Sequence, residues 1–310
     1  MTMRCDRRTI LAGGMASALA TLAGRPSRAA EGSGATEGTA DEGLGPLCVF
    51  AKHLQWLSNE ALADLLVELD VAGIEATVRD DGQVKPEDAR RGLPKLAEAL
   101  DRRDRRIVIM TTGITSPDSP HAAEVLETAA KLGVRHYRMG YYQYDLNKPI
   151  LPQLQNFTRQ AERLAQQNRA LGIVGVYQNH AGDRYVGAPL WDLRQMLESI
   201  SPAEIAVAYD VRHATVEAGM SWPLNWAMIR PHVGAIFLKD FHWTEGKAEN
   251  VPLGTGQVDP KLFAAVRDSG LAVPVSLHME YIDHRDPDRI DECIAAYRAD
   301  RIATRELLGI

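Results

Sequence analysis

Residues 205–240 read IAVAYDVRHATVEAGMSWPLNWAMIRPHVGAIFLKD and show a pattern that repeats along most of the chain. Two short apolar runs, 205–209 and 233–238, are each followed at once by charged residues. Runs of this length are typical of strands that are buried on both faces, as in a parallel sheet. Six further runs of this kind occur at 47–50, 73–78, 107–110, 134–139, 173–177 and 273–277.

Longer amphipathic stretches lie between these runs. Leu62, Leu65, Leu66 and Leu69 have the i, i+3, i+4, i+7 spacing that predicts a helix. Further helices are expected at 122–132, 154–171, 190–199, 262–269 and 288–308. The apolar runs recur about every 32 residues, and eight strand–helix units of that length close into a barrel. We therefore predict an α/β protein with a single (β/α)8 TIM barrel. A doubly wound open sheet is the alternative, although no glycine-rich phosphate loop follows any run.

Composition and charge narrow the class of protein. The chain has 310 residues, of which 45% are hydrophobic and 25% charged, as in an ordinary globular protein. A barrel of roughly 250 residues fits, with about 50 residues left over. The 35 Lys and Arg residues against 41 Asp and Glu residues give a net charge of −6. We therefore expect no nucleic-acid partner, because a broad basic face is missing.

The amino-terminal residues have the features of an export signal. Residues 1–30 combine Arg7 and Arg8, an apolar stretch, and small residues near position 30. We predict a twin-arginine signal peptide, a periplasmic location, and no membrane association after cleavage, with a membrane anchor as the alternative. Its removal takes away five Arg and one Asp, so the charge becomes 30 − 40 = −10. Residues 31–45 are predicted to be a flexible linker and residues 46–310 the barrel, in which Cys48 and Cys293 are expected to be buried free thiols.

Polar residues gather directly after the predicted strands. In a TIM barrel the active site is built from these carboxyl ends of the strands and the loops that follow them. Five of the nine histidines lie there, together with acidic residues, and this combination predicts a polar pocket that suits a divalent metal ion. The residues concerned are Lys52, His53, Arg79, Arg138, Gln178, Asn179, His180, Asp210, His213, Lys239, Asp240, His242, Trp243, His278 and Glu280.

The order of motifs over about residues 47–300 resembles the sugar phosphate isomerase/epimerase superfamily, the xylose isomerase-like TIM barrels. The stretches that carry this resemblance are 73–79 (GIEATVR), 177–180 (YQNH), Asp210 with His213, Lys239-Asp240, 252–259 (PLGTGQVD) and Glu280. The family includes sugar epimerases, dehydratases and a DNA endonuclease. The endonuclease branch is disfavoured here by the acidic charge.

The resemblance implies one divalent metal ion (Mn, Co, Zn or Mg) held by Glu, Asp, His and Glu on strands five to eight. Asp210 and Glu280 match two of these positions, whereas Gln178 stands in place of the first Glu and Phe237 in place of the His. Gln178 can still bind a metal through its carbonyl oxygen, but Phe237 cannot. We therefore expect Gln178, Asp210, His213 and Glu280 as ligands, with His180 or His278 as substitutes. A weakened or lost metal is the alternative.

The resemblance also implies a metal-dependent carbohydrate isomerase or epimerase that removes a proton next to a carbonyl. Family epimerases use two Glu residues on opposite faces of the sugar, and one of these is missing here. We therefore expect an asymmetric reaction on an unphosphorylated sugar or keto-sugar, with Glu280 or His180 as the base and the metal or Lys239 as the electrophile. A simple ion pair with Asp240 is the other interpretation of Lys239.

Several residues at the strand ends are expected to bind the substrate. They are Lys52, His53, Arg79, Arg138, Asn179, Asp240, His242, His278 and Trp243. Two other functions remain open: a 3-keto-glycoside lyase or hydrolase that uses the same residues, and a non-catalytic exported sugar-binding protein. The sequence does not predict the oligomeric state.

Overall fold

The computed structural model describes residues 43–310, so the predicted signal peptide and most of the predicted linker lie outside the described residues. Eight parallel strands close into a barrel in the order β1-β10-β7-β6-β5-β4-β3-β2. Their bounds are β1 (Leu47–Phe50), β2 (Gly73–Thr77), β3 (Arg106–Thr111), β4 (His136–Arg138), β5 (Val174–Gln178), β6 (Ile205–Asp210), β7 (Val233–Leu238) and β10 (Val275–Leu277). The predicted barrel is confirmed, and the open sheet is wrong.

Each of the eight predicted apolar runs overlaps one barrel strand, with small differences at the ends. The last run begins at position 273, but β10 begins only at Val275. Pro274 precedes it and has no N–H group to donate to a ladder. Leu47 of β1 pairs with Val275 of β10, and Cys48 pairs with Gly73 of β2, which closes the barrel.

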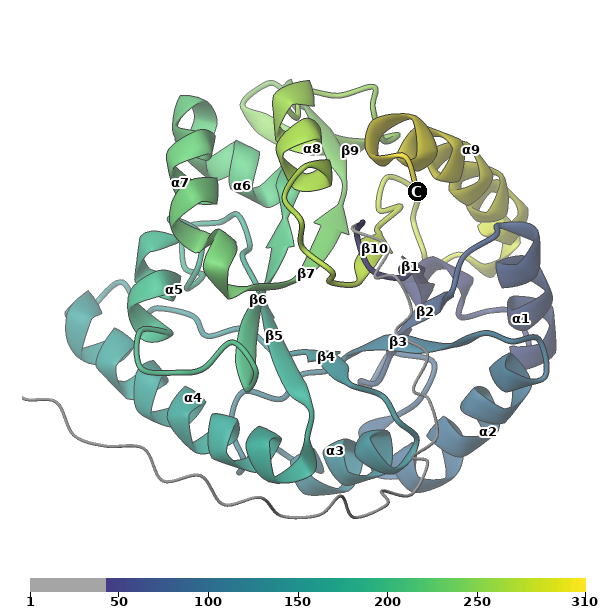
Figure 1. Cartoon of the computed structure of the whole chain (residues 1–310), viewed down its shortest axis with the longest axis horizontal. Coiled ribbons are helices and arrows are strands. Elements are labelled where there is room, and N and C mark those ends of the chain that lie inside the picture. The colour runs from purple at the N-terminus through teal and green to yellow at the C-terminus, as the bar shows by residue number, and fades with distance from the viewer. Residues whose placement is uncertain (1–42) are drawn as a thin grey trace, which may run out of the picture. The chain divides into compact units, whose positions relative to one another are not determined.

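Helices surround the barrel strands (Figure 1). Their bounds are α1 (Asn59–Glu68), α2 (Ala89–Asp101), α3 (Ala122–Lys131), α4 (Ile150–Leu171), α5 (Trp191–Met196), α6 (Val211–Ala218), α7 (Trp222–Ile229), α8 (Pro260–Arg267) and α9 (Ile290–Leu308). The sequence did not predict α2, α6 and α7. In α2, Gly92 and Pro94 interrupt the apolar pattern, and α6 follows β6 without a loop because the Asp210 carboxylate accepts a hydrogen bond from His213 N at 3.0 Å.

An antiparallel hairpin that the sequence did not predict follows β7 directly. It consists of β8 (Asp240–Thr244) and β9 (Lys247–Val251). The turn residues Glu245 and Gly246 have φ values of 50° and 78°, which is the backbone conformation of a tight two-residue hairpin turn. His242 and Trp243 therefore lie on a strand outside the barrel rather than in a loop at its mouth.

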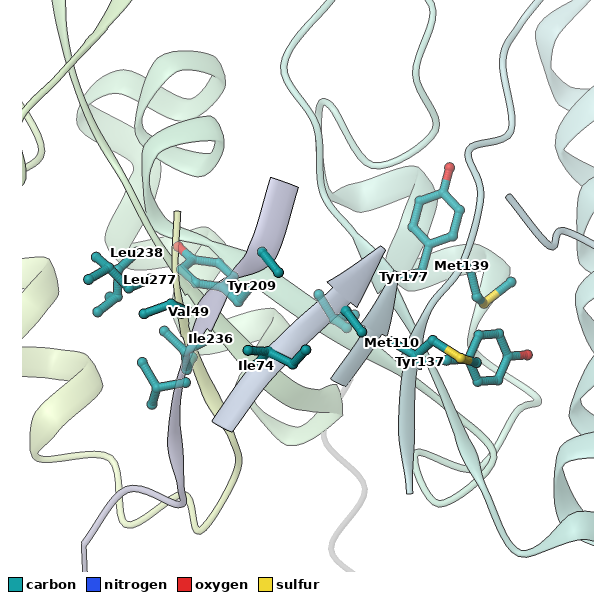
Figure 2. Packing of buried hydrophobic residues seen from close by; sticks show 14 of the residues in the cluster. Val49, Ile74, Met110, Tyr137, Met139, Tyr177, Tyr209, Ile236, Leu238 and Leu277 are labelled. Atoms are coloured by element: carbon teal, nitrogen blue, oxygen red, sulfur yellow. The ribbon is translucent and has the colours of Figure 1, made fainter. Parts of the chain in front are cut away.

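Strand alternation separates two sets of buried side chains. One set fills the inside of the barrel and consists of Cys48, Val108, Ile109, Val176, Ala206, Ala208, Ala235 and Phe237. The other includes Tyr209, which packs on Trp226 of α7, and Figure 2 shows members of this set on several strands. Because side chains two residues apart share a face, Asp210 follows Ala208 towards the barrel axis, and Lys239 follows Phe237. The apolar interior is thus capped by charged residues at the carboxyl ends of the strands.

The structure also bears on the predictions for the cysteines, the start of the barrel and the membrane. Cys48 and Cys293 are buried free thiols, as predicted. Contacts with the barrel begin just before the predicted boundary at residue 46, since Leu44 packs against the core and Gly45 N donates to Val273 O at 2.9 Å. Within residues 43–310, no helix has the length and apolar character needed to cross a membrane.

Candidate active site

A cavity of about 170 Å³ opens at the carboxyl ends of the barrel strands. It is lined by Phe50, Lys52, Arg79, Arg138, Tyr141, Gln178, His180, Lys239, His278 and Glu280. All of these except Phe50 and Tyr141 were predicted as site residues from their positions after the strands. A larger cavity of about 620 Å³ is lined by α4 and α5 residues such as Leu151 and Trp191, but none of the predicted site residues reaches it.

Lys239 is the centre of the site. Its Nζ lies 2.9 Å from Asp210 Oδ2 and 2.7 Å from Glu280 Oε2, so one ammonium group bridges both carboxylates. The other oxygen of Glu280, Oε1, lies 3.2 Å from Lys52 Nζ. The partners of Lys239 are therefore on β6 and after β10, and the ion pair with Asp240, the alternative interpretation of Lys239, is absent from the described residues.

The charges in this cluster stabilise one another. Burial disfavours the charged form of Lys239, but Asp210 and Glu280 outweigh that effect and raise its pKa above the ordinary value. Burial alone would raise the pKa of Glu280, yet the positive charges of Lys239 and Lys52 hold it well below the ordinary value. The lysine is thus an ammonium and Glu280 a carboxylate at neutral pH.

Gln178 connects the cluster to the next strand end. Its Nε2 donates to Asp210 Oδ2 at 2.7 Å, and its Oε1 accepts from Arg138 Nη1 at 2.7 Å. The Tyr141 hydroxyl also contacts Gln178 Oε1 and Arg138. The amide of Gln178 therefore faces Asp210 with its donor side, while its carbonyl oxygen is already occupied.

Two imidazole rings, tilted by 34° to each other, lie next to each other at the site, and that of His180 lines the cavity. The rings of His180 and His213 have their centroids 4.0 Å apart. Burial, followed by the charge of Lys239, lowers the pKa of His180 to about 4, and burial lowers the pKa of His213 well below its ordinary value. Both rings are neutral at pH 7. His180 Nδ1 lies 2.8 Å from the carbonyl oxygen of Ala181, to which it donates, and this leaves Nε2 of His180 as a proton acceptor.

Beneath the cavity lies a buried ion pair whose acidic member was not predicted as a site residue. Glu75 of β2 contacts His278 Nε2 at 2.7 Å and also accepts from Ser276 Oγ at 2.6 Å. Phe50 and Phe237 pack on the two sides of the His278 ring, with centroids 4.5 and 4.4 Å away. The sequence signal for Glu75 is a lone carboxylate within the apolar run 73–78, where an unpaired charge would not be tolerated.

Five predicted substrate-binding residues do not line the cavity. His53 Nε2 contacts Ile282 O at 3.1 Å, His242 Nε2 contacts Thr255 O at 2.7 Å, and Trp243 is half exposed on the hairpin. Asn179 exchanges hydrogen bonds with the backbone of Asp210 and so fixes that residue. The fifth residue is Asp240.

Asp240 anchors a loop. Its carboxylate accepts hydrogen bonds from the backbone N–H groups of Gly254, Gly256 and Val258 at 2.9–3.1 Å. Gly256 has no room for a side chain, because a Cβ there would lie 2.2 Å from Asp240 Oδ1. The motif 252–259 is therefore explained by close approach of the loop backbone to a buried carboxylate.

The predicted metal ligands do not fit a divalent ion. Asp210 and Glu280 share the ammonium of Lys239, and Gln178 presents its NH2 group to Asp210 rather than its oxygen. His213 Nε2 lies 3.1 Å from Lys239 Nζ, so it faces a cation. Throughout residues 43–310, no three His, Cys, Asp or Glu side chains are arranged to hold a metal. The expected ligand set of Gln178, Asp210, His213 and Glu280 is thus replaced by ion pairs and hydrogen bonds.

The closed parallel barrel makes this a TIM-barrel protein. Its charged pocket lies at the carboxyl ends of the strands, where the active sites of TIM-barrel enzymes are found. Residues 63–299 match the family described as xylose isomerase-like TIM barrel. The chain belongs to this family. A comparison with curated protein sequences found no match.

Solved structures share the fold at low sequence identity. A 3-keto-D-glucoside 4-epimerase from E. coli is 12% identical with a TM-score of 0.62, over 84% of this chain and 99% of that one. The IOLI protein with a bound zinc atom is 14% identical with a TM-score of 0.65, over 86% and 100%. A probable 3-DHS dehydratase from Bacillus anthracis is 14% identical with a TM-score of 0.62, over 81% and 98%.

Proposed function

We propose that the protein is an isomerase or epimerase that removes a proton next to the carbonyl of an unphosphorylated sugar or keto-sugar. The observation that carries this proposal is that the ammonium of Lys239 and the unprotonated Nε2 of His180 belong to residues lining one small cavity. One base and one electrophile are what such a reaction needs. Membership of the xylose isomerase-like family supports the substrate class.

The roles follow from which atoms are already engaged. Both oxygens of Glu280 are paired, with Lys239 and Lys52, so this carboxylate is a poor base. His180 is the better base. It takes the proton from carbon, the C–H electron pair becomes the enolate double bond, and the carbonyl oxygen carries the negative charge beside Lys239. Return of a proton to the other face of the same carbon gives an epimer. If the hydroxyl proton of that carbon first moves to the former carbonyl oxygen, protonation of the former carbonyl carbon makes the other oxygen the new carbonyl and gives an isomer.

The size and charge of the cavity limit the substrate. Its volume of about 170 Å³ is below the roughly 300–1,000 Å³ of pockets for drug-sized ligands and favours a single sugar ring. Arg79 pairs with Asp81 at 3.0 Å, and Arg138 is bonded to Gln178. With these cations and Lys52 already paired, no built site for a phosphate lines the cavity.

Solvent-exchange measurements test the proposal. The purified full-length protein is incubated in D2O with free ketoses and with a 3-keto-glucoside, and NMR follows deuterium entering the carbon next to the carbonyl. We expect exchange with wild type and none with H180Q, while D183N, an exposed change outside the cavity, should exchange normally. Tight sugar binding without any exchange would instead indicate a sugar-binding protein.

A lyase acting on 3-keto-glycosides is the second candidate. Arg79 lines both the active-site cavity and a neighbouring cavity of about 230 Å³, where a leaving group could extend. Removal of the C2 proton would then break the C1–O bond, and the aglycone would leave with that electron pair and take up a proton. Release of aglycone in the same incubation distinguishes this reaction from isomerisation.

The proposed location is the periplasm, reached by the twin-arginine route. The support is the sequence of residues 1–30, with Arg7 and Arg8 before an apolar stretch. Fusing residues 1–45 to a reporter should send it to the periplasm. The R7K/R8K double change should stop this export, and unchanged export would contradict the proposal.

A further inference from the structure

We propose that the ammonium group of Lys239 is the resident cation of this site and excludes a divalent metal ion from the position between Asp210 and Glu280. The two carboxylates are held from different strands, yet the same nitrogen lies within 2.9 Å of both. The side chain of Lys239 is 5% exposed, so solvent does not compete for these contacts. The protein therefore supplies from its own chain the positive charge that a metal would bring.

The local charge balance supports this assignment. Asp210 and Glu280 contribute two negative charges, and Lys239 and Lys52 contribute two positive charges. Adding a divalent ion would leave an excess of two positive charges in a buried space. Arg138 nearby, held through Gln178, would increase that repulsion. A metal could enter only if Lys239 were displaced.

Lys239 also has one N–H group that can donate a hydrogen bond to a ligand. An ammonium group has three N–H donors, of which two point to Asp210 and Glu280. The third faces His213 Nε2 at 3.1 Å, while Arg212 Nη1 faces His213 Nδ1 at 2.9 Å. A neutral imidazole accepts at only one nitrogen, so His213 cannot accept from both cations. When Arg212 holds the ring, a hydrogen of Lys239 is left for another acceptor.

The catalytic part of the inference rests on the proposed function. A carbonyl oxygen that becomes an enolate in the cavity would accept this third hydrogen from Lys239. The same ammonium would then both pair with the two carboxylates and stabilise the developing charge. The exclusion of metal does not depend on what the substrate is.

Metal titration tests the inference directly. Full-length protein is stripped with a chelator and titrated with Mn²⁺, Co²⁺ and Zn²⁺ by calorimetry, with elemental analysis and thermal melting alongside. We expect wild type to bind no stoichiometric ion and its Tm to stay unchanged. The triple change Q178E/F237H/K239M restores carboxylate and imidazole donors and removes the ammonium, so it should bind one ion per chain. Its Tm should rise by roughly 5–10 °C with metal at 100 times its Kd.

K52M is the matched control. It also removes a lysine bound to Glu280 but leaves Lys239 between the carboxylates, so it should bind no metal. Stoichiometric binding by wild type that is lost in D210A would overturn the inference, whether or not the triple variant folds. Chelated wild type that is inactive on every sugar and still binds no metal would contradict the proposed function. It would not contradict the inference that Lys239 is the resident cation.

Discussion

Two buried charge clusters lie at the mouth of the barrel, and they differ in how far their charged groups are exposed to the cavity. The upper cluster is Lys239 with Asp210 and Glu280, and the lower pair is Glu75 with His278. In the lower pair the side chains are 0% and 2% exposed, and two Phe rings cover the imidazole. In the upper cluster Glu280 is 18% exposed and Lys239 lines the cavity. The lower pair thus reaches the cavity only where His278 forms part of its wall, whereas the upper cluster presents both Lys239 and Glu280 to a ligand.

The largest effect is expected from breaking the lower pair. H278A leaves the Glu75 carboxylate buried without its cation and should reduce the free energy of unfolding by about 3–5 kcal/mol. E75Q should cost less, because a neutral imidazole is tolerated in that space. Urea denaturation of both variants measures this asymmetry. Equal losses would mean that packing of the ring, rather than the stranded charge, dominates.

The next effect concerns the upper cluster. K239M should reduce turnover of a keto-sugar substrate by about 10²–10³-fold, the usual loss when one group that stabilises an oxyanion is removed. It should also be less stable than wild type, since two carboxylates lose their shared partner. Steady-state kinetics beside a thermal melt separates the two effects. Normal turnover in a folded K239M would exclude Lys239 from the reaction.

Asp300 in α9 is a buried carboxyl that, unlike the members of the two clusters, has no ion-pair partner among residues 43–310. Burial raises its pKa to about 6, although Leu253 N donates to it at 3.1 Å. Since an unfolded Asp has a pKa of about 3.9, the contribution of Asp300 to stability should be greatest below pH 4 and should be lost as the pH rises through 6, by up to about 3 kcal/mol. D300N should remove that loss at pH 7 and flatten the profile between pH 4 and 6. Denaturation at several pH values checks this.

The smallest effect is expected at the edge of the upper cluster. Lys52 is 21% exposed and pairs with one oxygen of Glu280. K52M should lower the free energy of unfolding by no more than about 1 kcal/mol, because solvent competes for such a pair. A loss of stability as large as that of K239M would show that solvent exposure does not decide how much each lysine contributes.

The strands were predictable because parallel strands that are buried on both faces have continuous apolar sequences. The placement of the charged residues was partly predictable as well, since they follow those runs. Their pairing was not, because it depends on which strands are neighbours across the barrel. Lys239 and Asp240 are adjacent in sequence, but consecutive residues point to opposite faces, so one enters the site and the other holds a loop.

The predicted metal illustrates the same limit. Side-chain types after the strands correctly indicated carboxylates and imidazoles near one another. Which cation they hold depends on the reach of one lysine from β7, and no sequence pattern encodes that distance. Helix α6 was missed for a different reason: it starts at the very end of β6, with no loop to mark a boundary.

Closure of the barrel has a consequence for how the chain acquires its structure. Since β1 has β2 and β10 as neighbours, the first strand keeps an unpaired edge until residues 275–277 have been synthesised. The Tyr297 hydroxyl of α9 also donates a hydrogen bond to Phe50 O, so the final helix holds the end of the first strand in place. Exposed strand edges favour association between chains. A nascent chain of this protein should therefore need protection during almost the whole of translation, and truncation before α9 should yield aggregates rather than a smaller folded unit.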